Sequence, residues 1–190
     1  MYSDPNSVKR ISSLGAGPIG GGWTAHFLAR GYDVTAYLHD KSETSSFMSI
    51  LKTAWVSLTE LGLAPDASME RLRIVTDLEE ALEGAEFVQE SGPERLEVKQ
   101  ELYSEMGKIL PPSIIIGSST SGLMMTDIQS DCSTPERTVI GHPFNPPYLL
   151  PLVEIVGGKR TAPEAIAWAG EFYKVAGKAP LMMKKEIPGS

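Results

Sequence analysis

The stretch Ile11-Ser12-Ser13-Leu14-Gly15-Ala16-Gly17-Pro18-Ile19-Gly20 decides the fold, because it predicts a short buried strand, a tight glycine turn and the start of a helix in direct succession. In this pattern the first glycine permits the tight turn, the second lets the backbone approach a pyrophosphate, and the third lets the helix pack on the strand. Amides at the start of a helix attract an anion. We therefore predict a dinucleotide site at Gly15, Gly17, Pro18, Ile19 and Gly20, the alternative being a turn with a structural role only.

Short apolar runs and amphipathic segments alternate along the rest of the chain. The runs at 11–14, 33–38, 72–75, 87–88, 114–116 and 138–140 predict strands, and the segments at 19–29, 47–61, 78–82 and 94–110 predict helices. Ser42 or Thr44 is the expected cap of the second helix. This alternation is typical of an α/β protein, so we expect a Rossmann-type, doubly wound, mostly parallel sheet.

Composition limits the classes of partner. With 190 residues, 42% of them hydrophobic and 22% charged, the chain suits one domain with one core. A net charge of −7 argues against a nucleic-acid or membrane surface, so we expect small-molecule partners. We expect no metal site. Cys132 is the only cysteine and excludes an intrachain disulfide, while residues 1–10 carry no apolar signal segment. A cytoplasmic location is therefore expected.

The second predicted strand ends without the acidic residue that an NAD site normally uses to accept the ribose hydroxyls. By register that position is Leu38, which cannot accept a hydrogen bond. We expect Asp40 to reach the ribose from the following loop and His39 to lie beside the adenine. NADP stays open because Lys41 is a candidate partner for its 2′-phosphate, but the loop holds no arginine, and NAD is favoured.

A histidine and a glutamate lie on either side of a proline-rich turn within residues 141–156. The predicted strand 138–140 leads to His142, and the apolar run after the turn carries Glu154 as its single charged residue. A neutral imidazole takes up a hydroxyl proton near neutral pH, and a carboxylate on its other nitrogen fixes the tautomer and stabilises the charged ring. We predict a base and its orienter, the alternative being a loop histidine and an edge-strand glutamate without a role in chemistry.

Hydroxyl side chains follow the strand predicted at 114–116. Ser118, Ser119 and Ser121 come directly after its carboxyl end. Because ligands of open α/β sheets bind at the carboxyl ends of the strands, this position favours binding over hydroxyls satisfied within the loop.

The glycine turn, the run Ser118-Ser119-Thr120-Ser121-Gly122-Leu123, the run His142-Pro143-Phe144-Asn145-Pro146 and Glu154 together resemble the 3-hydroxyacyl-CoA dehydrogenase superfamily over essentially the whole chain. Residues 89–95 and 142–154 most resemble its L-carnitine dehydrogenase and L-gulonate 3-dehydrogenase (lambda-crystallin) branches. The resemblance implies oxidation of a carnitine-like or gulonate-like 3-hydroxy acid to the 3-keto acid with hydride transfer to NAD. The alternatives are a 3-hydroxyacyl-CoA dehydrogenase and a non-catalytic, crystallin-like dinucleotide-binding protein.

The resemblance also implies roles for individual residues. His142 would be the catalytic base and Glu154 its electrostatic partner, Ser121 would bond the substrate oxygen, Asn145 would line the reaction site, Glu94 and Lys99 would contact the nicotinamide-ribose side of the cofactor, and Ser119 would stand at a cofactor position where the acyl-CoA branch tends to carry asparagine.

Substrate choice can be argued from charge and aromatic residues. Residues 41–70 hold only two lysines against four acidic residues, which disfavours the phosphates of coenzyme A. A carnitine site would need aromatic faces for a trimethylammonium group, and Tyr148 and Phe144 are the nearby aromatic residues in the sequence. A compact hydroxy acid therefore fits better.

Members of the superfamily continue beyond a segment like Lys185-Glu186-Ile187-Pro188-Gly189 into a phenylalanine, a further catalytic asparagine and a helical domain that forms the homodimer. Here Ser190 takes the place of the phenylalanine. We therefore expect residues 1–190 to form a single NAD-binding domain that lacks the helical domain and turns over substrate poorly or not at all.

Overall fold

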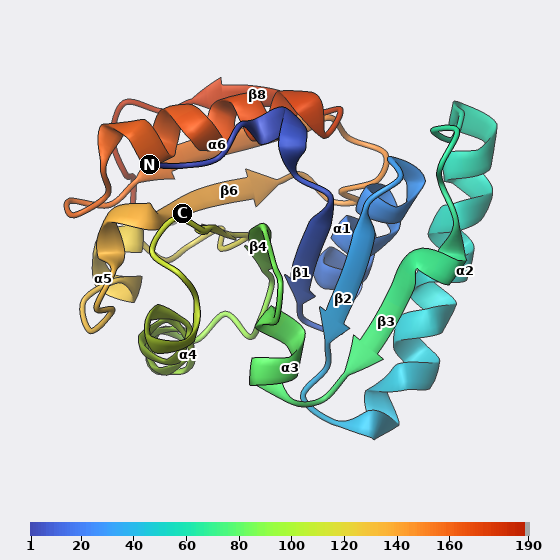
Figure 1. Ribbon diagram of the computed structural model, residues 1–190, viewed down its shortest axis with the longest axis horizontal. Helices are drawn as coiled ribbons and strands as arrows, with labels where there is room; N and C mark the ends of the chain where they lie inside the picture. The colour runs from blue at the N-terminus through green and yellow to red at the C-terminus, as the bar shows by residue number, and fades with distance from the viewer. Residues whose placement is uncertain (189–190) are drawn as a thin grey trace.

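The computed structural model describes residues 1–188 and shows an α/β fold built on one sheet (Figure 1). Gly189 and Ser190, which end the C-terminal segment quoted above, lie outside the described residues. Within residues 1–188 the sheet has eight strands: β1 (Arg10–Leu14), β2 (Asp33–Tyr37), β3 (Leu72–Val75), β4 (Phe87–Glu90), β5 (Ile115–Ser118), β6 (Thr138–Pro143), β7 (Leu152–Gly157) and β8 (Ala179–Met182). The helices of this part are α1 (Pro18–Ala29), α2 (Thr44–Leu61), α3 (Leu78–Leu82), α4 (Leu96–Ile109), α5 (Met125–Ile128) and α6 (Pro163–Val175).

The strand order is β3-β2-β1-β4-β5-β6-β7-β8, and β1 to β6 run parallel. β7 then pairs antiparallel with β6, and β8 pairs parallel with β7. The order of the strands reverses between β1 and β4, because the chain first adds strands on one side of β1 and then on the other. Such a switch point leaves a crevice at the carboxyl ends of the strands, where open α/β sheets bind their ligands. The predicted doubly wound, mostly parallel sheet is confirmed.

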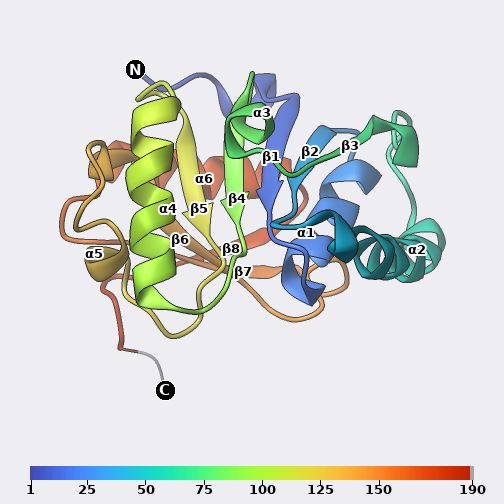
Figure 2. The ribbon, with the colours of Figure 1, turned by 90° about the horizontal axis from the view of Figure 1, so that it is seen from below.

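Helices cover both faces of the sheet, and adjacent strand residues supply the two cores (Figures 1 and 2). Phe87 of β4 packs with α1, α2 and α6 on one face, whereas the next residue, Val88, packs with α3, α4 and α5 on the other. A strand buried on both faces reads as a continuous apolar run, which explains why periodicity located these strands. Among residues 1–188, none of the helices combines the length and apolar character needed to cross a membrane.

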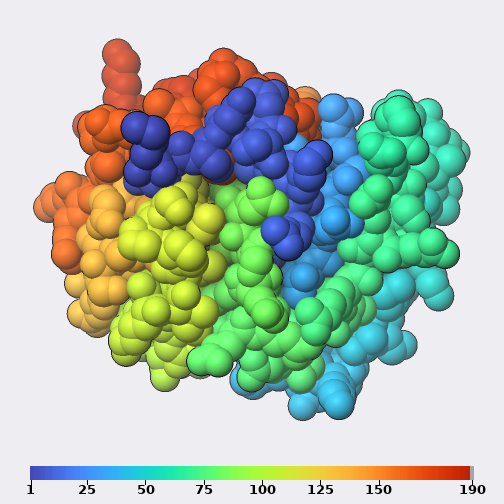
Figure 3. All heavy atoms as spheres, in the orientation of Figure 1, coloured from blue at the N-terminus to red at the C-terminus, as the bar shows by residue number. Residues whose placement is uncertain are grey.

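The N-terminal segment packs against α6. The short 3-10 helix η1 (Pro5–Ser7) lies beside α6, which the space-filling view shows as blue atoms next to orange ones (Figure 3). The indole nitrogen of Trp168 in α6 donates a hydrogen bond of 2.6 Å to the carbonyl of Ser3. The first residues are thereby tied to the helix that lies farthest along the chain.

Several elements differ from the sequence predictions at their ends. The second strand stops at Tyr37, and α4 starts at Leu96, because residues 91–95 form an extended connection from β4 to α4. Neither expected residue caps α2: Asp40 instead caps the preceding 3-10 turn η2 (Lys41–Glu43), and α2 continues from that turn. The helices α5 and α6 and the strand β8 were not among the predicted elements. The signal for α6 was present, since its buried residues Ala165, Trp168, Ala169, Phe172 and Tyr173 follow helical spacing.

A fully buried arginine joins the end of α4 to the start of β6. The Arg137 guanidinium donates to the carbonyls of Pro111 (2.6 Å) and Ile114 (2.9 Å), and also to those of Leu110 and Met106 at the end of α4. Burial lowers the pKa of Arg137, but no carboxylate pairs with it among these contacts. The guanidinium therefore satisfies backbone acceptors that a helix end leaves without partners.

Replacing this arginine tests how much the fold depends on it. Arg137→Met keeps the apolar length of the side chain but leaves buried carbonyls without a donor, so we expect a loss of about 3 kcal/mol or more in unfolding free energy, measured by urea titration. Arg71→Met, at a half-exposed ion pair with Asp33, is the matched control and should cost less than about 1 kcal/mol. Equal losses in the two variants would contradict a structural role for the Arg137 contacts.

Candidate functional site

A cavity of about 840 Å³ lies at the carboxyl ends of β1 and β4, at the switch point of the sheet. The glycine turn at 15–20 forms one wall, residues 91–93 and α4 form another, and Tyr37, His39 and Glu43 close the end near β2. The predicted residues Gly15, Gly17, Pro18, Ile19 and Gly20 all line it. The sequence motif and the cavity therefore coincide.

The three glycines of the turn have different steric roles. Gly15 has φ +124°, and a Cβ atom there would collide with the carbonyl oxygen of Ser91, while a Cβ at Gly20 would collide with the carbonyl oxygen of Gly15. At Gly17 no atom lies within 4 Å of the Cβ position. Space therefore remains above the first turn of α1 where its amides are without partners, which suits the pyrophosphate of a dinucleotide.

The residues near the end of β2 divide between the core and the cavity. Leu38 is fully buried in the apolar core, whereas its neighbours Tyr37 and His39 line the cavity. The structure places Asp40 away from the cavity lining, where its carboxylate accepts a hydrogen bond of 2.8 Å from the Ser42 amide. Hydrogen bonding from Ser42, first through its side chain and then through its amide, lowers the pKa of Asp40. Glu43 is the acidic residue that lines this end, and sequence reasoning missed it because its position depends on the η2 turn.

Lys99 forms a buried ion pair beneath the loop at 91–93. Its ammonium group donates to Glu90 Oε2 (2.6 Å) and to the carbonyl of Gly92 (3.3 Å). Glu90 also accepts bonds from the Gly92 amide and from the Ser118 hydroxyl. Lys99 is not among the residues that line the cavity, so in this structure it supports a cavity wall.

Glu94 holds the loop that follows β5. Its carboxylate accepts hydrogen bonds from the Thr120 hydroxyl and from the Ser121 amide, the latter at 3.2 Å. Ser121 itself is exposed. Glu94 thus fixes the backbone at the position where the resemblance places a substrate-binding hydroxyl.

Ser119 joins the loop after β5 to the cavity wall. Its hydroxyl lies 3.1 Å from Trp23 Nε1, 2.9 Å from Gln89 Nε2 and 2.8 Å from the hydroxyl of Ser91, which lines the cavity. Sequence reasoning included Ser119 but not its three partners, which come from α1, β4 and the residue after β4.

His142 and Glu154 face each other across the antiparallel pair of β6 and β7. They are register partners, and His142 Nδ1 lies 3.0 Å from Glu154 Oε2. The two side chains are 23% and 32% exposed, so solvent and ligands reach them. With Nδ1–H donating to the carboxylate, the lone pair on Nε2 is free to take a proton. The ring of Phe144 lies 5.4 Å from the imidazole, while Asn145 is exposed in the same loop.

A buried lysine supports the proline-rich loop from below. The Lys178 ammonium group donates to the carbonyls of Pro147 and Leu150 and lies 5.1 Å from the centre of the Trp23 ring. Burial lowers the pKa of Lys178 to about 8. His26 of α1 is buried nearby, with Nε2 2.6 Å from the carbonyl of Ala176, and burial together with Lys178 lowers its pKa to about 3.

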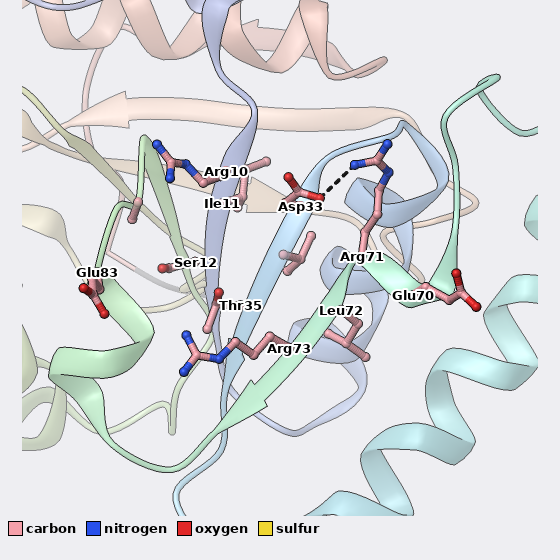
Figure 4. A pocket seen from close by; sticks show the side chains of 12 residues that line it. Arg10, Ile11, Ser12, Asp33, Thr35, Glu70, Arg71, Leu72, Arg73 and Glu83 are labelled. Atoms are coloured by element: carbon pink, nitrogen blue, oxygen red, sulfur yellow. Dashed lines mark hydrogen bonds and ion pairs between the residues drawn. The ribbon is translucent and has the colours of Figure 1, made fainter.

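A second, smaller hollow of about 250 Å³ lies at the opposite, amino ends of β1, β2 and β3 (Figure 4). Arginines line it, but each is paired with a carboxylate: Arg71 with Asp33 at 2.8 Å, Arg10 with Glu86 at 3.5 Å, and Arg73 with Glu80. These pairs leave no unbalanced positive charge to attract an anion. The candidate functional site is therefore the large cavity together with the His142 and Glu154 pair, which lies at the same edge of the sheet but outside the lining of the cavity.

This chain is similar in sequence to a known protein family and to named bacterial enzymes. Residues 10–187 match the model of the 3-hydroxyacyl-CoA dehydrogenase NAD-binding domain. L-carnitine dehydrogenase of Streptomyces coelicolor is 52% identical over 98% of this chain and 59% of its own length, and that of Pseudomonas putida is 47% identical over 96% and 57%. The chain thus spans less than two thirds of the length of these relatives.

Solved structures show the same architecture. A 5-formyl-3-hydroxy-2-methylpyridine 4-carboxylic acid 5-dehydrogenase, described as an NAD⁺-dependent dismutase, superposes with a TM-score of 0.88 at 31% identity over 96% of this chain and 59% of that one. For 3-hydroxybutyryl-CoA dehydrogenase from Escherichia coli the TM-score is 0.85 at 29% identity, over 93% and 38%.

The buried imidazole of His26 predicts a pH dependence of stability. Its folded pKa of about 3 lies below its ordinary value of 6.5, so between these values the unfolded chain binds a proton that the folded chain does not. Stability is then lost as the pH falls through this window, by about 1 to 2 kcal/mol between pH 6.5 and pH 5. Urea titrations should show this extra loss in the wild type relative to His26→Gln, whose amide still donates to Ala176. The same slope in both proteins would contradict it.

Proposed function

Because the chain belongs to the family of 3-hydroxyacyl-CoA dehydrogenase NAD-binding domains, we propose that it serves a dehydrogenase that oxidises the hydroxyl group of a small 3-hydroxy acid of the L-carnitine class. The observation that carries this proposal is the His142 and Glu154 pair at 3.0 Å, at the carboxyl end of β6 and so on the same edge of the sheet as the cavity. A dinucleotide site without such a pair would support binding but not proton transfer.

The proposed cofactor is NAD, which when bound supplies the nicotinamide carbon that accepts the hydride. The glycine turn holds the pyrophosphate on the first amides of α1, and the walls at Tyr37, His39 and residues 91–93 enclose the rest. Glu94 and Lys99 act through the loops that they hold, rather than by lining the cavity. Asp40 remains a sequence prediction, and Glu43 is the better placed acidic residue.

His142 acts as the base in the direction of alcohol oxidation. Its Nε2 takes the hydroxyl proton, and the Glu154 carboxylate on Nδ1 keeps the ring in the required tautomer and stabilises the imidazolium that forms. Ser121, on the loop held by Glu94, and Asn145, in the loop after β6, are proposed to hold the substrate oxygen by their resemblance to the family. Alignment by these groups is the main contribution of the protein to the reaction rate.

The charge of the cavity favours NAD over NADP. Glu43, Glu101 and Glu105 line it, and none of the lysines or arginines of the described residues does. Burial raises the pKa of Tyr37, and the charges of Glu105, Asp77 and Glu43 raise it further, which places these carboxylates near the end of β2. A 2′-phosphate would be repelled by these carboxylates and would find no cation. Lys41, the partner considered for NADP from the sequence, is not part of the lining.

The substrate class rests on the relatives and on the residues near the base. Two of the bacterial relatives, which are 52% and 47% identical to this chain over the aligned residues, are named L-carnitine dehydrogenase. Phe144 offers an aromatic face next to His142, which suits a quaternary ammonium group. Tyr148, in contrast, packs partly against the core. A 3-hydroxyacyl-CoA ester remains the alternative substrate, and homodimerisation through a further helical domain remains a prediction.

Calorimetric titration tests the cofactor proposal. The chain should bind NAD saturably and NADP at least about 10-fold more weakly, and Glu43→Gln should narrow this difference by removing one repelling charge. Gly17→Ala should keep the unfolding temperature, because its Cβ meets no atom within 4 Å, yet lower NAD affinity by about 10-fold or more.

Two results would contradict the proposal. Equal affinity for NAD and NADP would show that the cavity carboxylates of Glu43, Glu101 and Glu105 do not discriminate between the cofactors. If neither cofactor binds saturably, a structural protein becomes the better interpretation.

A substrate panel tests the reaction. L-carnitine, L-gulonate and a 3-hydroxyacyl-CoA ester are supplied with NAD to this chain and to a version extended by the C-terminal part of the Streptomyces coelicolor relative, and NADH formation is followed. We expect L-carnitine to be oxidised fastest, and His142→Gln to lower turnover by about 100-fold or more with NADH affinity unchanged. Turnover that survives His142→Gln would show that His142 is not the base. Equal turnover of both versions would contradict the expectation that the chain alone is weakly active.

A further inference from the structure

The hydroxyl groups of Ser119 and Ser91 form a connected pair between the core and the large cavity. Ser119 lies on the core side, where it meets Trp23 and Gln89, and Ser91 lies on the cavity side next to the glycine turn. The backbone also fixes Ser91, because its amide donates a bond of 2.7 Å to the carbonyl of Leu14, at the end of β1. The direction of the hydrogen bond between the two hydroxyls decides what Ser91 can offer to a ligand.

Counting protons gives that direction. A serine hydroxyl has two lone pairs and one proton. The indole nitrogen of Trp23 is a donor only, and it lies 3.1 Å from Ser119 Oγ. The amide nitrogen of Gln89 lies 2.9 Å from the same oxygen. Both lone pairs of Ser119 are therefore occupied, and its only proton is available for the bond of 2.8 Å to Ser91 Oγ.

The orientation of the Gln89 amide follows from its other neighbours. Its nitrogen lies 3.4 Å from the carbonyl of Gly141, which accepts hydrogen bonds only. Its oxygen accepts a bond of 2.7 Å from the Tyr173 hydroxyl. Gln89 and Tyr173 are fully buried, so water does not compete for these hydrogen bonds. The amide nitrogen therefore faces Ser119. The Ser119 hydroxyl in turn donates its proton to Ser91, on the cavity side.

We infer that Ser91 is a binding residue for the cofactor, and that its hydroxyl proton is donated to an oxygen atom of the bound dinucleotide. Ser91 accepts the proton of Ser119, so its own proton has no acceptor among the hydrogen bonds of residues 1–188, and the cavity is where a ligand oxygen would meet it. Trp23 and Gln89 are positioning residues, because they act on the cofactor only through the two hydroxyls. This inference rests on the proposed NAD site.

Reversing the direction of the hydrogen bond between Ser119 and Ser91 would be unfavourable. If Ser91 donated to Ser119, three donors would compete for two lone pairs, and one buried N–H group would lose its partner. A bound oxygen acceptor therefore finds the Ser91 proton already turned outward. Such preorganisation raises affinity because no hydrogen bond inside the protein has to break on binding.

A double-mutant cycle on NAD affinity tests the inference by calorimetry. Ser91→Ala should weaken NAD binding by about 10-fold, which is the loss of one hydrogen bond in a preformed site. Trp23→Phe keeps an aromatic ring at this position but removes the N–H donor to Ser119, which frees a lone pair and lets the Ser91 proton turn inward, so we expect NAD binding to weaken by about 3-fold or more. In the Ser91→Ala background the Trp23→Phe change should have no further effect.

The controls separate this effect from damage to the fold. Trp55→Phe, on the outer side of α2, is the matched substitution and should leave NAD affinity unchanged. If Trp23→Phe does not fold, Gln89→Met removes the other donor and takes its place in the cycle.

Additive effects of the two changes would overturn the role of Trp23 through the hydroxyl pair, and unchanged affinity in Ser91→Ala would overturn the role of Ser91. In both cases the wild type still binds NAD. Absence of NAD binding by the wild type would instead overturn the proposed function, and this inference with it.

Discussion

Close backbone contact around the first turn of α1 is the constraint on which the rest of the structure depends. Gly20 packs on the carbonyl of Gly15, Gly21 faces Ile50 of α2, and Gly22 faces Pro147 of the loop after β6, each at a distance that leaves no room for a Cβ atom. Three consecutive residues thus fix the position of one helix against its strand, the neighbouring helix and the proline-rich loop. The position of the α1 amides follows from these contacts, because a helix held on three sides cannot shift along its axis without opening one of them.

The same helix also connects the two chemical halves of the site. Its N-terminal end forms the cavity wall that suits a pyrophosphate, and one turn later Trp23 lies between Ser119 and Lys178. Lys178 holds the carbonyls of Pro147 and Leu150, which belong to the loop that follows His142. A buried cation without a paired carboxylate is costly, and its cost is offset here by two carbonyls and an aromatic face. The proposed base His142 and the proposed cofactor site at the glycine turn are therefore positioned by a common support, helix α1.

The sequence predicted those parts of the site in which short-range pattern and function coincide. The glycine turn has a fixed spacing, and the pairing of His142 with Glu154 follows from two strands joined by one turn, so both appear in the structure as expected. Lys99, Asp40 and Glu94 were less predictable, because a charged side chain can bind any of several protein groups near it. Lys99 pairs with the buried Glu90, and Asp40 binds the Ser42 amide, although the positions of Lys99 and Asp40 in the sequence also suited contact with a ligand. Gln89 and Trp23 were beyond prediction, since nothing near them in the sequence indicates their contacts with Ser119.

Hydrogen-bond donors and the proton acceptor lie at different ends of the site. At the glycine turn and Ser91 the protein presents hydrogen-bond donors, which suit the oxygens of an anionic dinucleotide. At β6 and β7 it presents a carboxylate behind an imidazole, which suits removal of a proton. Between them lie Gln89 and Ser119, whose hydrogen bonds are all used within the protein. The donors of Gln89 and Ser119 are therefore not available to a ligand, so the proposed cofactor would take its hydrogen bonds from the first turn of α1 and from Ser91, while the hydroxyl group of a separate substrate would meet His142.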